Sequence, residues 1–397
     1  MDFIKKLLLA KQEITQKQLR LKLRTTLFVS IAAVIFFSSL IAIVYFLGFN
    51  VFRDKAIESQ GEMARTLASA VDSTIEKQAE LLKLNANTQL IIDALKENNL
   101  KYRTKSEKET QRYLMDVDKR WIEASDDHPF LKDYLGNKLS LGLKALKGED
   151  EKIVSLIVTD KFGGLAGSTT RPSGFYSFDK DWWLNSYAKG RGKIFIGGVE
   201  YDEESNLWCL PFAVPIEDET GTVIGIAKAS ISIDTFFQPL LNFRIGKTGN
   251  AVLADDKAYL VYHQKAAPFA NKFCEYEEFQ KTLQNSDKWG ILGSAYLNHG
   301  KTLAAYSEVV SAKGVNWFVF VERDLREIFA PLNKLILVMV LIGIALTIIL
   351  ALSVFILSAQ ESPGSILQVI KETPLVKTED EKSNRIEGRA KRLPRDK

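Results

Sequence analysis

The residues of this sequence that could do chemistry are few and widely separated. Its three histidines, His128, His263 and His299, lack the short spacing that metal ligands show. The string Gly246–Thr248 matches the end of a phosphate-binding loop, but Leu241 stands where that loop requires a glycine. No Ser-His-Asp or Cys-His arrangement stands out. We therefore expect no enzyme activity, no cofactor and no metal, and the net charge of +4 argues against a nucleic-acid partner.

Two apolar segments, residues 27–49 and 335–357, contain no charged residue and have the length of a bilayer-spanning helix. Lys and Arg exceed acidic residues over positions 1–26, and such a basic excess beside a span is typical of the cytoplasmic side. The first apolar segment is too long for the core of a cleaved signal peptide, so we expect an uncleaved anchor. The sequence predicts an extracytoplasmic domain over residues 50–334 and a disordered cytoplasmic tail over residues 358–397.

Directly after the first span, residues 52–95 have a helical pattern without proline. Small or apolar residues recur every seventh position at Ile57, Ala64 and Val71. This spacing is typical of a coiled-coil dimer seam, but the same row also suits a long helix that packs against its own domain. Both alternatives remain open from the sequence.

The remaining part of the middle block contains an internal repeat. A strand–turn–strand pattern over residues 153–168 recurs over residues 252–263, and each half then ends with a second hairpin. The sequence therefore predicts two antiparallel-sheet lobes in tandem, a distal one over about 100–240 and a proximal one over about 241–326. Cys209 and Cys274 fall in different lobes, so we expect two buried unpaired thiols rather than a disulfide.

Specific strings extend this prediction to a family. The run Phe243-Arg-Ile-Gly-Lys-Thr-Gly-Asn-Ala-Val-Leu, followed by Tyr259-Leu-Val-Tyr-His263, resembles the membrane-proximal module of double Cache (dCache) sensors. The segments Asp181-Trp-Trp and Tyr201-Asp202 resemble the membrane-distal module. The resemblance implies an α+β fold, in which two transmembrane helices flank an extracytoplasmic double PAS-like domain with a long N-terminal stalk helix. It also implies a two-span receptor of the bacterial cytoplasmic (inner) membrane, with both termini in the cytoplasm.

The resemblance further implies a small-molecule site in the distal lobe. Amino-acid-binding members of the family use an arginine two residues before a Trp-Tyr pair, a Tyr-x-Asp element and a later aspartate. Here Lys180 replaces the arginine and Ser230 replaces the later aspartate, so we do not carry over amino-acid specificity. A carboxylate or an amine is the expected ligand chemistry, although aromatic residues on strands are more often core than contact. The candidate ligand-binding residues are Lys180, Trp182, Trp183, Tyr201, Asp202, Trp208 and Ser230.

The sequence contains no recognisable output domain after the second span. We expect a membrane-bound sensory receptor, a homodimer, that passes its signal to a separate cytoplasmic protein through the membrane helices. One alternative is the sensory fragment of a truncated or split histidine kinase, diguanylate cyclase or methyl-accepting chemotaxis protein. Another is a membrane-tethered extracytoplasmic scaffold or enzyme.

Overall fold

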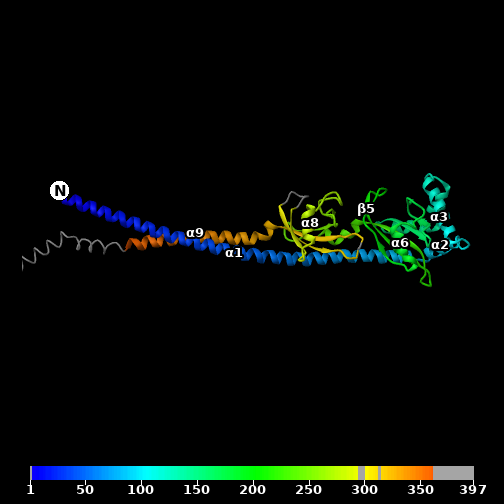
Figure 1. Ribbon diagram of the computed structural model, residues 1–397, viewed down its shortest axis with the longest axis horizontal. Coiled ribbons are helices and arrows are strands. Elements are labelled where there is room, and N and C mark those ends of the chain that lie inside the picture. Colours follow the sequence, from blue (N-terminus) through cyan, green and yellow to red (C-terminus); the bar gives the residue numbers. More distant parts are fainter. Residues whose placement is uncertain (1, 294–299, 312–313, 361–397) are drawn as a thin grey trace, which may run out of the picture. The chain divides into compact units, whose positions relative to one another are not determined.

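The computed structural model describes residues 2–293, 300–311 and 314–360 (Figure 1). The chain divides into two compact units, one made of the residues up to Phe52 and from Phe329 onward, the other of Arg53–Ile328. Of the predicted disordered tail, residues 358–360 instead continue a helix, and the rest lies outside the described residues.

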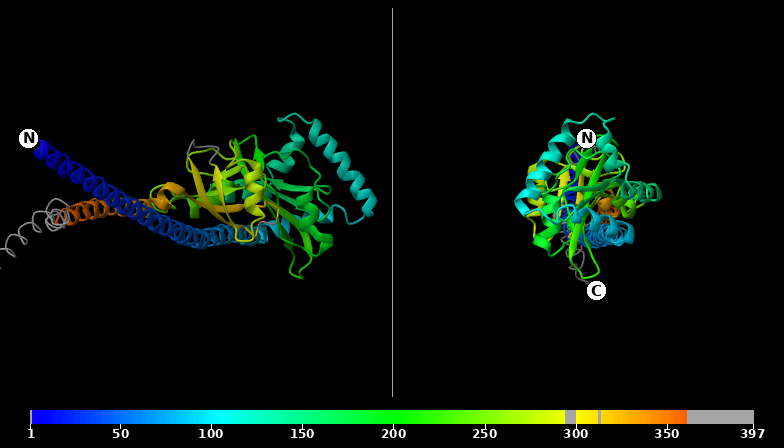
Figure 2. Two further views of the ribbon diagram at one scale, coloured as in Figure 1. Left: turned by 60° about the vertical axis from the view of Figure 1, so that its left-hand side comes forward. Right: turned by 90° about the vertical axis from the view of Figure 1, so that its right-hand side faces the viewer.

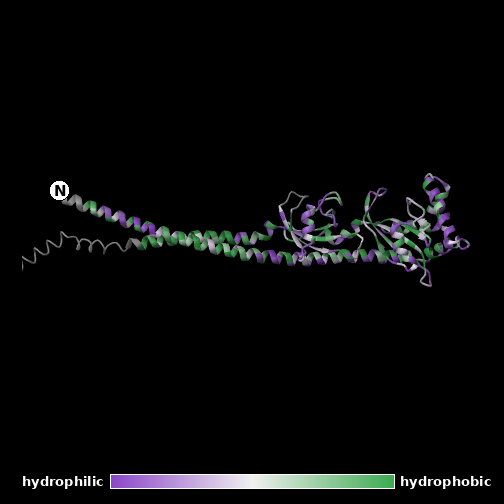
Figure 3. Ribbon diagram, viewed as in Figure 1, coloured by the Kyte–Doolittle hydropathy of each residue, from purple (hydrophilic) through white to green (hydrophobic). Residues whose placement is uncertain are grey.

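The first unit consists of the beginning of helix α1 (Asp2–Ala86) and most of helix α9 (Leu325–Gln360). Within the described part of the chain, these are the two helices long and apolar enough to cross a membrane, and their apolar stretches are green in Figure 3. The helices contact each other where Phe49 stacks on Phe329 with ring centroids 4.6 Å apart. A Cβ atom at Gly48 would lie 2.6 Å from Leu332 Cδ1, so this glycine allows a close approach of the two helices.

The second unit contains two antiparallel sheets. The first sheet has the strand order β2-β1-β6-β5-β3, with β4 paired to β5. Its strands are β1 (Ile153–Asp160), β2 (Leu165–Ser168), β3 (Phe195–Ile196), β4 (Glu200–Asp202), β5 (Leu207–Glu217) and β6 (Val223–Ser232).

The second sheet has the strand order β8-β7-β11-β10-β9. Its strands are β7 (Asn250–Ala254), β8 (Leu260–Tyr262), β9 (Trp289–Gly293), β10 (Lys301–Glu308) and β11 (Phe318–Asp324). Leaving β4 aside, the two sheets have the same arrangement. The first two strands in chain order (β1 and β2, or β7 and β8) lie at one edge, and the last strand (β6 or β11) pairs with the first strand on one side and with the strand before it on the other. The internal repeat in the sequence therefore corresponds to two lobes with one strand order, which we call the first lobe and the second lobe.

Short helices complete the lobes. Helices of the first lobe are α2 (Gln89–Leu100), α3 (Glu107–Glu123), α4 (Pro129–Leu135), α5 (Lys138–Glu149), α6 (Asp181–Tyr187) and the 3₁₀ turn η1 (Ala188–Gly190). The segments η2 (Ile233–Phe237) and α7 (Gln238–Leu241) lead to the second lobe, which contains α8 (Tyr276–Leu283). Helix α3 begins with a capping box in which Ser106 and Glu109 exchange hydrogen bonds, so its start is encoded locally.

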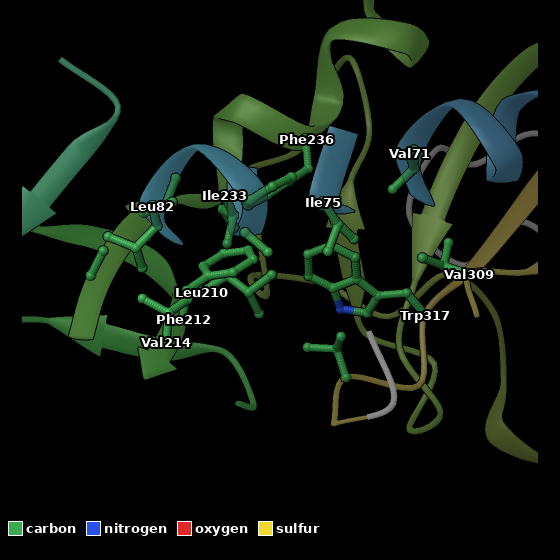
Figure 4. Packing of buried hydrophobic residues seen from close by; sticks show 14 of the residues in the cluster. Val71, Ile75, Leu82, Leu210, Phe212, Val214, Ile233, Phe236, Val309 and Trp317 are labelled. Atoms are coloured by element: carbon green, nitrogen blue, oxygen red, sulfur yellow. The ribbon is translucent and has the colours of Figure 1, made fainter. Parts of the chain in front are cut away.

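One continuous apolar core joins the part of α1 after Arg53 to both sheets (Figures 2 and 4). Ala64, Val71 and Ile75 of α1 are completely buried in it. Of the heptad row, Ala64 and Val71 are thus buried against the protein's own lobes and Ile57 is half-buried, which supports the second of the two alternatives for this helix. The sequence predicted one helix over residues 52–95, whereas α1 ends at Ala86 and α2 starts at Gln89. With the double-lobed arrangement and the two long apolar helices, the predicted fold class is confirmed.

Candidate ligand-binding site

The two faces of the first sheet have different surroundings. Ala227, Ala229 and Ile231 of β6 belong to the core shared with α1, and we call their side of the sheet the α1 face. The alternate residues Ile226, Lys228 and Ser230 point to the other side, because side chains alternate along a strand. Trp183 of α6 packs against Ile226 there, so we call this side the α6 face.

Trp183 is the buried anchor of α6. Its side chain is 1% exposed and stacks on Tyr187, with ring centroids 4.7 Å apart. Its indole Nε1 has no hydrogen-bond partner among the described residues. The Tyr176 hydroxyl is likewise buried without a described partner, and burial raises the pKa of Tyr176 to about 12. The Phe178 ring contacts both residues, at 5.4 Å from the Trp183 ring and 5.8 Å from the Tyr176 ring. Two unsatisfied donors therefore border one region, and buried polar groups usually have a partner such as water or ligand.

A charged cluster lies beside this region on the same face. The Lys228 ammonium forms an ion pair with Glu200 of β4 at 2.9 Å and lies 5.9 Å from the centre of the Trp182 ring. The Ser230 hydroxyl donates to the same Glu200 carboxylate oxygen at 3.3 Å. The Lys228 side chain is only 14% exposed, so its charge is largely removed from water. A largely buried lysine beside an aromatic ring, paired with the exposed Glu200 carboxylate, can bind a polar ligand group of either sign.

Of the predicted site residues, Trp182, Trp183 and Ser230 make contacts within the α6 face. Lys180 caps the start of α6, is exposed, and has Asp179 as its charged neighbour at 3.9 Å. Asp202 accepts hydrogen bonds from the backbone N–H and hydroxyl of Ser205, both at 2.8 Å, as expected for a turn. The structure therefore does not join Lys180 and Asp202 to the Lys228 cluster.

Tyr201 and Trp208 lie opposite each other in the β4–β5 ladder, with ring centroids 5.0 Å apart. Trp208 packs against the core on the α1 face, and its ring also contacts Phe269 of the second lobe at 4.5 Å. In this geometry both residues make contacts within the protein, and a ligand role for them stays a prediction.

Sequence reasoning missed Lys228 and Glu200. Lys228 stands two residues before Ser230 and is the charged residue within the otherwise apolar and small run of β6. A lysine at that position in a buried strand was the available signal. Glu200 gave no comparable signal, because its place opposite Lys228 depends on how β4 and β6 both pair with β5.

Other reactive groups have structural surroundings. Cys209 and Cys274 are free and buried, as predicted, and burial raises the pKa of each thiol to about 12. No cluster of His, Cys, Asp or Glu suited to a metal ion occurs within the described ranges. In the Gly246–Thr248 turn, the N–H groups of Lys247 and Thr248 donate to the Glu327 carboxylate at 2.9 and 2.8 Å.

Two lobes with one strand order thus share a core with a long helix, in a chain with two helices apolar enough to cross a membrane. The chain belongs to the Cache domain family, because the dCache_1 model matches residues 50–332.

Solved structures similar to this chain include domains of bacterial sensory proteins. The ligand-binding domain of the Pseudomonas aeruginosa amino acid chemoreceptor PctC with GABA is 15% identical over 68% of this chain and 100% of that chain, with a TM-score of 0.41. The ligand-binding domain of the Pseudomonas fluorescens chemoreceptor CtaA with L-isoleucine is 13% identical over 71% of this chain and 97% of that chain, with a TM-score of 0.44. A Campylobacter jejuni chemoreceptor sensory domain is 12% identical over 70% and 97% of the two chains, with a TM-score of 0.42. No curated protein matches the chain.

Proposed function

We propose that this protein is a membrane-bound sensory receptor that binds a small ligand on the α6 face of its first lobe. The observation that carries the proposal is the Lys228–Glu200–Ser230 cluster under Trp182, next to the unsatisfied Trp183 Nε1 and Tyr176 hydroxyl. Family membership supports it, since Cache domains are sensor domains.

The ligand in this proposal carries a carboxylate or an amine. An anionic group would bind Lys228 and the donors Trp183 Nε1 and Tyr176 Oη, whereas an amine would bind Glu200. Each new contact would compete with the existing Lys228–Glu200 ion pair. Binding would therefore rearrange β4 relative to β6 rather than fill a fixed cavity.

Signal transmission would pass through β6. Its alternate residues contact the α6 face on one side and the shared core with α1 on the other. A ligand-induced shift of β6 would thus change the packing of α1, provided that the ligand binds one of two arrangements more tightly. We propose that the termini lie in the cytoplasm, that the receptor is a homodimer, and that a separate cytoplasmic protein receives the signal.

The test is a ligand screen on the full chain purified in detergent. Amino acids, organic acids, amines and purines are compared by thermal shift, where a ligand at 100 times its Kd adds about 2.7 kcal/mol of stability. For a compound that binds, Lys228→Met should weaken binding at least tenfold, as measured by calorimetry. The matched control is Lys152→Met, an exposed lysine just before β1, which should leave binding unchanged. Unchanged affinity in Lys228→Met would exclude the α6 face as the binding site.

A further inference from the structure

A polar cavity lies in the second lobe, on the side of its sheet that faces away from α1. Its volume is about 330 Å³, which is within the range of small-molecule sites. Val319 and Val321 of β11 belong to the core shared with α1, whereas Phe320 belongs to the separate core cluster of the second lobe. Glu322 is two residues after Phe320 on the same strand, so its side chain points to the same side of the sheet as Phe320. There it forms a polar floor for the cavity.

The floor is built from three neighbouring strands. Glu322 is 3% exposed and accepts hydrogen bonds from Asn250 Nδ2 of β7 at 3.1 Å and from the Thr302 hydroxyl of β10 at 3.2 Å. Asn250 also lines the cavity. Its amide NH₂ donates to Glu322, and its Oδ1 is buried without a described partner. The floor thus presents acceptors, which suit an ammonium group.

The rim of the cavity carries positive charge, opposite to that of Glu322 on the floor. Arg244, Lys247 and Lys265 line the cavity, and none of the three has an ion-pair partner within the described part of the chain. His263 also lines it, and burial, with a contribution from Lys265, lowers the pKa of His263 to about 4. The histidine is therefore neutral at neutral pH, and three lysine and arginine charges face a single buried carboxylate on the floor, with Asp324 beside them.

We infer that this cavity is a second ligand site, which binds a small zwitterion of the amino-acid type. The ammonium group of the ligand binds at Glu322, and its carboxylate binds the cationic rim of Arg244, Lys247 and Lys265. A simple anion would meet the buried Glu322 carboxylate, and a simple amine would meet the three cations. A molecule with both charges satisfies both ends of the cavity.

The cavity is also connected to α9. Lys247 and Thr248 line it, and the same two residues donate their backbone N–H groups to Glu327 in the first turn of α9. A ligand carboxylate that draws Lys247 inward would act on this connection. Ligand binding at the second site would thus act on α9, whereas binding on the α6 face would act on α1.

The experiment is calorimetry with the full chain in detergent, in a Lys228→Met background that removes the proposed site of the first lobe. The probes are the L-amino acids, with acetate and methylammonium as single-charge probes. We expect at least one amino acid to bind, and neither single-charge probe to bind at the concentration that saturates the site. Lys265→Met and Glu322→Gln should each weaken that binding at least tenfold. Lys257→Met, an exposed lysine of the same lobe outside the cavity, should leave it unchanged.

Three outcomes would overturn the inference: no amino acid binds, acetate binds as tightly as the amino acid, or binding survives Lys265→Met. Lys265 is exposed, so this variant tests the rim without disturbing the buried floor if Glu322→Gln fails to fold. Each result is independent of the first-lobe site, because that site is already removed in the background protein.

Discussion

At the residue scale, Asp160 is a completely buried carboxyl at the end of β1. Its Oδ1 accepts hydrogen bonds from the N–H groups of Phe162 and Gly164, at 2.9 and 3.0 Å, which fix the turn to β2. Burial raises the pKa of Asp160 to about 6, although these hydrogen bonds and Tyr102 oppose the shift. The side chain is thus needed for the turn but is costly to ionise.

This cost predicts a pH dependence. The folded protein binds the Asp160 proton more tightly than the unfolded chain, whose aspartates titrate near pH 4. Stability from this group is therefore present at low pH and declines as the pH rises from about 4 to about 6, by about 3 kcal/mol in total. In Asp160→Asn the amide oxygen keeps both turn hydrogen bonds, and this decline should be absent. Chemical denaturation of both proteins at several pH values measures the difference, and parallel curves would contradict the prediction.

The sequence located the site only in part. Trp182, Trp183 and Ser230 are predicted because they occupy positions of a family pattern, although Ser230 replaces its aspartate, and they lie on one face of the first sheet. Lys180 is predicted beside them because it stands where the family pattern has an arginine, but it is the exposed residue before the first turn of α6. The partners Lys228 and Glu200 meet through the registers of two strand pairs, and a register depends on long-range pairing that a local pattern does not specify.

At the scale of elements, the part of α1 that follows Arg53 owes its position to side-chain packing. Ile75 is completely buried, whereas Leu84, nine residues further along the same helix, is 71% exposed. Ile75→Ala should reduce the free energy of unfolding by about 2–5 kcal/mol, because it leaves a cavity in the core shared by both lobes. Leu84→Ala is the matched control and should change it by less than about 0.5 kcal/mol. Equal effects in urea unfolding would show that the helix does not pack in this way.

The first turn of α9 depends on Glu327. Burial opposes its ionisation, but the Thr248 hydroxyl, the N–H groups of Lys247 and Thr248, and Arg323 lower the pKa of Glu327 to about 2. Glu327→Gln keeps the shape but removes the charge, so we expect a loss of about 1–3 kcal/mol. Thermal unfolding of the full chain at pH 7 checks this. Glu308→Gln, at the exposed end of β10, is the control, and a similar melting temperature for all three proteins would argue against the connection.

The helix break at residues 87–88 shows what the sequence leaves undecided at this scale. Neither Asn87 nor Thr88 is a strong breaker, and the apolar residues resume at Leu90. The break is explained by a tertiary contact, since the Asn87 side chain accepts a hydrogen bond from the backbone N–H of Glu217 at 3.1 Å. Propensity alone cannot reveal such a partner, which lies 130 positions away.

At the scale of the whole molecule, the double-lobed plan was readable from the sequence because each lobe repeats the same hairpins. The orientation of the chain across the membrane is a further prediction, based on the basic residues before the first span. A reporter enzyme that is active only outside the cytoplasm, inserted at the exposed Glu203–Glu204 turn, should be active in cells. The same reporter fused after residue 360 should be inactive, and the reverse pattern would invert the proposed topology.

The two buried thiols have a practical consequence for following motion in this receptor. Since Cys209 and Cys274 are inaccessible and hard to ionise, maleimide dyes or nitroxide spin labels should not react with either of them in the native protein. A pair of cysteines engineered on the surfaces of the two lobes could then be labelled selectively in the natural background. Distance measurements between the two labels could then follow changes in the separation of the lobes without replacing the native cysteines.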